Sequence, residues 1–151
     1  MSTFPTKILL ATDASKDAEK AAQMASDIAN LSGSELHVVH VGNMKDFHIG
    51  PGVEQSFASR GGSLGEIREN AEKTLDEAVK QVEQAGGTVT KAHLRTGYPD
   101  EEILKFCDEQ GGFGLIVMGS RGLGPIRRRL MGSVSESIVT HAHCPVLVAR
   151  T

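Results

Sequence analysis

A stretch of glycine and serine residues near the carboxyl end of the chain has the types and spacing of a phosphate-binding loop. Gly119 and Gly122 allow the backbone to approach a ligand closely and to adopt angles that other residues avoid. Gly132 leads into Ser133 at a predicted helix start, where free backbone N–H groups and the positive end of the helix dipole favour an anion. Ser133 and Ser135 add hydroxyl donors. Together these groups predict a cradle for phosphate.

The same residues also have an ordinary structural interpretation. Glycines after a strand are commonly turn residues, and Ser133 with Glu136 has the spacing of a capping box that opens a helix. Three consecutive arginines, residues 127–129, would favour a phosphate, an RNA or an acidic protein, but such a run is more often part of a solvated loop. Taken alone, these residues leave phosphate binding and a plain helix connection as alternatives.

A second candidate for chemistry is Asp13, which follows the first apolar run of the chain. Its carboxylate could hold a ribose hydroxyl or a metal-bound water, and it could equally cap the next helix. The chain has no G-x-x-x-x-G-K-[ST] motif, no G-x-G-x-x-G motif after this run, and no second acid beside Asp13. P-loop, dinucleotide-binding and phosphoacceptor proteins are therefore excluded.

Residues of metal-binding type crowd together at His141, His143 and Cys144. These three side chains lie within four residues that span a helix end and a turn, so they cannot easily occupy three corners of the tetrahedral ligand set that zinc requires. We therefore predict no metal site made by the protein alone. No Ser-His-Asp or Cys-His pattern indicates a nucleophile, and no catalytic residue is assigned.

The overall composition is that of one globular domain over residues 1–151. Of the 151 residues 39% are hydrophobic and 23% charged, and the formal net charge is −3. Because no excess of positive charge is present, we expect no nucleic-acid partner. The longest apolar runs span a few residues, and the first seven residues have no signal-peptide core, so we expect a cytoplasmic protein that does not enter membranes. Cys107 and Cys144 are expected to be reduced and packed.

Short apolar runs alternate with segments of helical period along the chain. The predicted strands cover residues 7–11, 35–41, 88–95, 113–118 and 145–150. The predicted helices cover residues 15–32, 63–85, 99–110 and 133–142, with a long loop over residues 42–62. Gly33 suits the end of the first helix, and Pro99 suits the first turn of the third.

This alternation predicts an α/β fold: an open five-stranded parallel sheet with helices on both faces. Five strands wound this way most often lie in the order 3-2-1-4-5, which reverses direction between strands 1 and 4. Ligands bind beyond the carboxyl ends of the strands at such a switch point. Residues 11–13 and 119–122 are predicted to meet there.

Gly119, Gly122 and Gly132–Ser133 together resemble the G-2x-G-9x-G-[ST] signature of the universal stress protein family, in its ATP-binding branch. The resemblance extends over the chain. Residues 7–13 resemble the first strand of the family with its terminal acid, residues 36–41 the second strand, and residues 143–150 the last. It implies the same Rossmann-like fold and a homodimer through residues 145–150.

The resemblance also implies roles for individual residues. Asp13 and the backbone around Ala11 and Val41 would lie at the adenosine, and Met118 and Gly119 at the ribose and first phosphate. The remaining implied nucleotide-binding residues are Arg121, Gly122, Gly132, Ser133, Val134 and Ser135, of which the glycines, serines and valine would hold the phosphates. The implied ligand is ATP with Mg²⁺.

Three functions are compatible with this sequence. The first is a stress-response protein that switches with ATP occupancy. The second is an ATP hydrolase, which would be slow because no general base and no Walker-type lysine stand beside the phosphates. The third is an interaction module of the same fold that needs no nucleotide; the intact glycine spacing argues against it.

Overall fold

The computed structural model describes residues 2–44, 64–120 and 132–150. The strands are β1 (Lys7–Ala11), β2 (Glu35–Asn43), β3 (Lys91–Gly97), β4 (Phe113–Gly119) and β5 (Val146–Ala149). The helices are α1 (Glu19–Ser32), α3 (Leu64–Gln84), α4 (Pro99–Gln110) and α5 (Ser133–His141). Among the helices of these ranges, none is long and apolar enough to cross a membrane.

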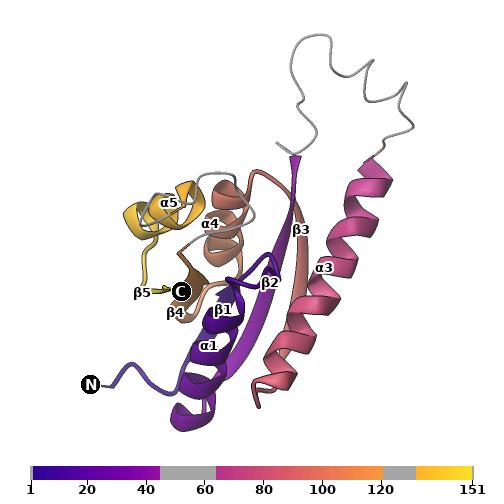
Figure 1. The fold of residues 1–151 in the computed structure, drawn as a ribbon. Coiled ribbons are helices and arrows are strands. Elements are labelled where there is room, and N and C mark those ends of the chain that lie inside the picture. The colour runs from indigo at the N-terminus through magenta and orange to yellow at the C-terminus, as the bar shows by residue number, and fades with distance from the viewer. Residues whose placement is uncertain (1, 45–63, 121–131, 151) are drawn as a thin grey trace.

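The strands form one parallel sheet in the order β3-β2-β1-β4-β5, which confirms the predicted topology. Figure 1 shows helices on both sides of the sheet, with α4 and α5 together near β4 and β5. From β1 the chain adds β2 and β3 on one side, and it then adds β4 and β5 on the other side. The direction of winding therefore reverses between β1 and β4, as a switch point requires.

Two hydrophobic cores lie on opposite faces of the sheet. Successive strand residues point to opposite faces, so Leu10 packs beneath α1 and α3 while its neighbour Ala11 packs beneath α4 and α5. Alanines of α1 allow this helix to lie close to the sheet, and Phe106 of α4 fills the other core at 2% exposure. Both cores extend to the carboxyl ends of the central strands.

Several element ends differ from the predicted ones. Helix α1 begins at Glu19 rather than at residue 15, because the N–H groups of Ala18 and Glu19 first close turns on the carbonyls of Ser15 and Lys16. Strand β2 continues through Asn43, into the segment predicted as a loop. Residues 45–62 of that loop lie outside the described residues.

The predicted capping box at the start of α5 is wrong. The N-cap is Gly132, Ser133 is the first helical residue, and no side chain caps this end. The predicted signals at α1 and α4 are confirmed, because Gly33 ends α1 in the left-handed conformation and Pro99 lies in the first turn of α4.

Candidate functional site

The carboxyl ends of β1 and β4 lie side by side at the centre of the sheet. Ala11 is in register with Val39 on one side and with Met118 on the other. Ala11, Val41 and Met118 are all buried, at 4 to 6% exposure, and all belong to the core under α4 and α5. The structure thus brings together three of the predicted site residues at the switch point.

The turn that follows β1 carries Asp13 and is closed by its own side chains. The Ala14 N–H donates to Thr12 Oγ1 and the Ser15 N–H donates to Asp13 Oδ1, each over 3.0 Å. Asp13 therefore shapes an Asx turn. It is not the N-cap of α1, which is Ala18 without a side-chain bond.

Two side chains from other elements also bind this turn. His40 of β2 places Nδ1 2.8 Å from the Thr12 carbonyl oxygen. Gln81 of α3 donates from Nε2 to the carbonyl oxygens of Ala14 and Ser15, both at 3.1 Å. Sequence reasoning missed both residues. The sequence indicates a role for His40 only in that it is a polar residue within the apolar strand β2, on the face opposite Val41.

The start of α5 lies against the end of β4. The Ser120 carbonyl accepts the Gly132 N–H, and the Ser120 N–H donates to the Ala149 carbonyl over 2.9 Å. Because the first turn of a helix has N–H groups without intrahelical acceptors, this contact places an anion-favouring helix end at the same edge as Ala11 and Met118. Ser133 lies exposed in that first turn.

Ser135, which was predicted to hold phosphate, also has a structural role. Its side chain is buried at 2% exposure, and Oγ lies 3.0 Å from the Gly132 carbonyl oxygen and 3.2 Å from that of Ser120. The hydroxyl thus joins α5 to the end of β4. Val134 is partly buried against the core under α4 and α5, and Gly119 pairs with Ala149 of β5.

Other predicted residues of the glycine-rich segment lie outside the described part of the chain. They are Arg121, Gly122 and the arginines at residues 127–129. The described residues at either side of this segment, Ser120 and Gly132, are hydrogen-bonded to each other.

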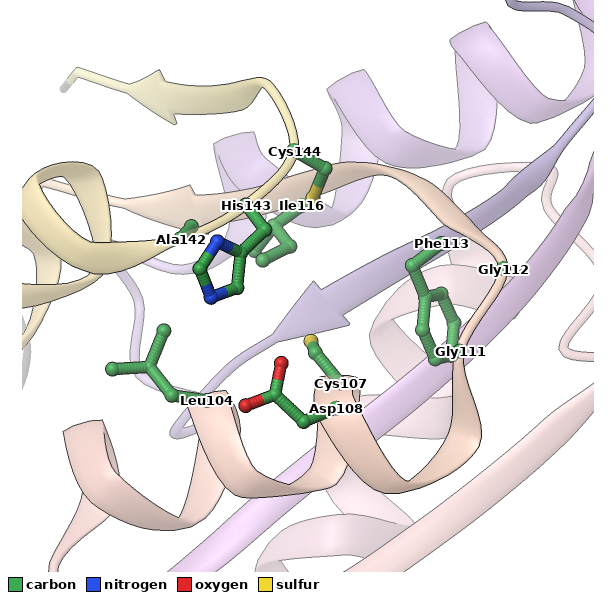
Figure 2. Close-up of a pocket in the computed structure, with 10 residues that line it drawn as sticks. All are labelled: Leu104, Cys107, Asp108, Gly111, Gly112, Phe113, Ile116, Ala142, His143 and Cys144. Carbon is green, nitrogen blue, oxygen red and sulfur yellow. The ribbon is translucent and has the colours of Figure 1, made fainter.

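A separate cavity of about 260 Å³ lies near the amino end of β4 (Figure 2). Its lining residues come from α4, from the start of β4 and from the segment between α5 and β5: Leu104, Cys107, Asp108, Gly111, Gly112, Phe113, Ile116, Ala142, His143 and Cys144.

The two cysteines of this cavity are not suited to nucleophilic chemistry. Burial raises the pKa of Cys107 to about 12, and burial also raises the pKa of Cys144. Both thiols are therefore protonated at neutral pH, whereas the thiolate is the reactive and metal-binding form. Over the described ranges, no three His, Cys, Asp or Glu side chains are grouped to hold a metal ion.

An open parallel α/β sheet whose switch point meets a helix N-terminus is the architecture of a nucleotide-binding class of proteins. The sequence profile of the universal stress protein family matches residues 5–150. This chain belongs to that family.

Similar proteins agree with this assignment over nearly the whole chain. A universal stress protein of Methanocaldococcus jannaschii is 33% identical over 144 residues, which are 95% of this chain and 81% of the relative. The solved structure of the universal stress protein UspA from Lactobacillus plantarum has a TM-score of 0.77 at 25% identity, with 96% of this chain and 97% of that chain covered.

A third relative was solved with a bound nucleotide. The universal stress protein from Archaeoglobus fulgidus in complex with dAMP has a TM-score of 0.67 at 28% identity and covers 96% of this chain and 98% of its own. The shared fold therefore includes a member that holds an adenine nucleotide.

Proposed function

We propose that this protein binds an adenine nucleotide at the carboxyl edge of β1 and β4, and that ATP is the ligand that switches it. The observation that carries this proposal is the bond between Gly132 and Ser120, because it sets the N-terminus of α5 beside the switch point. The helix end then offers donors for phosphate next to an apolar floor that Ala11 and Met118 make at the ends of two strands.

The division of the site follows from its chemistry. The apolar floor with Val41 and the Asp13 turn suits the nucleoside. Ser133 and Val134 in the first turn of α5 suit the phosphates, and Gly132, whose own N–H is donated to Ser120, allows a phosphate to approach the backbone closely. The relative from Archaeoglobus fulgidus supports the choice of an adenine nucleotide. Magnesium would arrive with the triphosphate, since ATP is bound in cells as its magnesium complex.

We further propose that nucleotide occupancy signals to other proteins, with hydrolysis slow or absent. The described residues of the site include no lysine, and the one carboxylate, Asp13, already accepts a bond from the Ser15 backbone. The alternative is an interaction module that folds in the same way and binds no nucleotide.

The proposal is tested by denaturing the purified protein and looking for released adenine nucleotide by chromatography. Isothermal titration with ATP, ADP and cyclic AMP, with and without Mg²⁺, then ranks the ligands. Gly122→Glu is expected to abolish ATP binding and to leave the melting temperature unchanged. Wild-type protein that releases and binds none of these nucleotides would support the interaction module instead.

We also propose that the protein is a homodimer through β5. This strand lies at the edge of the sheet, and its Val146, Leu147 and Val148 are only half-buried. An apolar edge with unpaired backbone groups is stabilised by pairing with a second copy.

A further inference from the structure

Ala14, one residue after Asp13, has an unusual backbone conformation. Its φ is 58°, in the left-handed region, and it is the sole residue other than glycine with positive φ in the described ranges. An L-residue with a Cβ atom adopts this region at a cost, so surrounding contacts must hold it there. Strain of this kind concentrates at ligand-binding sites, which makes those contacts worth identifying.

Within the described ranges, two distant side chains bind the backbone carbonyls of this turn. Gln81, on α3, uses its amide nitrogen for two carbonyl oxygens, those of Ala14 and Ser15. His40, on β2, faces the Thr12 carbonyl oxygen. A carbonyl only accepts, so Nδ1 of His40 carries the proton, and the nitrogen of Gln81 must be the atom that faces the turn.

The bonds of Gln81 leave its other amide atom without a partner. Its Oε1 is buried and accepts no hydrogen bond from the described residues. A buried acceptor without a donor is destabilising, and a nonpolar side chain of the same length would avoid this cost. Stability alone therefore does not account for glutamine at this position, whereas a need to fix the turn does.

We infer that His40 and Gln81 are positioning residues for the nucleotide site. They hold residues 12–15 in the strained conformation, so that the Asp13 turn is already formed when a nucleotide arrives and loses less conformational entropy on binding. This inference rests on the proposed function, and it adds the two residues that make the nucleoside side of the site rigid.

The first test replaces each donor. Gln81→Met keeps the length of the side chain and removes both bonds, and it is expected to weaken ATP binding about tenfold in calorimetry, because two neutral hydrogen bonds are lost. The melting temperature should fall only slightly, since removal of the unpaired acceptor offsets part of the loss of the two bonds. Gln23→Met is the matched control, because the Gln23 amide bonds Asp27 and the Ala85 carbonyl instead of the turn.

His40 provides a rescue test. His40→Leu removes the donor and should also weaken ATP binding about tenfold. In His40→Asn the amide nitrogen can take the place of Nδ1, so most of the affinity should return. Unchanged affinity in both Gln81→Met and His40→Leu would overturn the inference. So would affinity that falls only in step with melting temperature, because that is the behaviour of a merely structural residue.

A measurement without nucleotide separates this inference from the proposed function. Hydrogen exchange at the Ala14 and Ser15 amides, followed by NMR, should be faster in Gln81→Met than in wild type and unchanged in Gln23→Met. Wild-type protein that binds no nucleotide would refute the proposed function, and the exchange result would still decide whether Gln81 fixes the turn. Equal exchange in wild type and Gln81→Met would refute the role of Gln81 even if ATP binds.

Discussion

The proposed dimer leads to a prediction about one backbone donor, the N–H of Val148. The carbonyls of Pro145, just before β5, and of Ala149, at its end, accept the N–H groups of Ile116 and Ser120, over 3.0 and 2.9 Å. Because backbone groups alternate in direction along a strand, the odd-numbered residues face β4, and Val148 directs its N–H toward the free edge. Val148→Pro therefore removes an outward donor and no bond within the sheet.

The size of the effect follows from symmetry. A two-fold axis places the substitution on both strands of the interface, so one changed residue removes two hydrogen bonds. At about 0.5–1.5 kcal/mol for each bond, the dimer should lose about 1–3 kcal/mol. This corresponds to a roughly 5- to 150-fold higher dissociation constant, and the rigid proline ring in the interface can only increase it.

Light scattering coupled to size exclusion, run over a range of concentrations, measures this change. Val148→Thr is the matched control, because threonine keeps both the N–H and the branched shape, and it should remain dimeric where Val148→Pro is monomeric. Far-UV circular dichroism checks that both variants are folded. Wild-type protein that elutes as a monomer at micromolar concentration would refute the dimer, and a proline variant with wild-type affinity would refute its placement on β5.

Three further predictions concern the interior. Burial, followed by the charges of His37 and neighbouring cations, lowers the pKa of His93. The folded protein then resists a proton that the unfolded chain accepts near pH 6.5, so urea unfolding should show stability falling as pH drops below about 6.5, and less so in His93→Gln. Iodoacetamide should label Cys107 at pH 8 at least roughly a hundredfold slower in the folded protein than in urea, as mass spectrometry would show, because its pKa is about 12. Gly87→Ala should lower the free energy of unfolding by about 1–3 kcal/mol in urea titration, because the new Cβ would clash with the buried Ser26 side chain.

Local signals were sufficient to predict the fold. The apolar run at β1 ends where it was predicted, and Gly33 and Pro99 mark helix ends by conformations that their own backbones impose. The strand order followed because parallel strands joined by helices have few allowed windings. Each of these features depends on residues close together in the sequence.

The start of α5 shows where local signals fail. The spacing of Ser133 and Glu136 is that of a capping box, yet the helix includes Ser133 and begins after Gly132. A tertiary contact decides the outcome: the Ser120 carbonyl binds the Gly132 N–H, and Ser135 joins the same oxygen. The spacing of Ser133 and Glu136 says nothing about where Ser120 lies, because Ser120 follows β4 and meets the start of α5 only in the folded protein.

In the candidate site, too, some residues could be predicted from the sequence and others could not. The resemblance named Ala11, Val41 and Met118 as site residues, and the structure places all three in one core, on the same face of the sheet. Gln81 could not be predicted, since it is 67 residues from Ala14 and reaches the turn only through the packing of α3 against α1.

The position of the turn at the end of β1 explains why polar side chains are needed there. Within β1 the neighbouring strands satisfy the backbone, but after Thr12, whose N–H still reaches the Val39 carbonyl, the chain leaves the sheet and its carbonyls need new donors. His40 donates to the carbonyl of Thr12, and Gln81 donates to the carbonyls of Ala14 and Ser15. The supports arrive from β2 and α3, while the adjoining apolar floor belongs to the core under α4 and α5. The affinity of a nucleotide bound at this edge should therefore respond to changes in either layer, directly through the floor or indirectly through the turn.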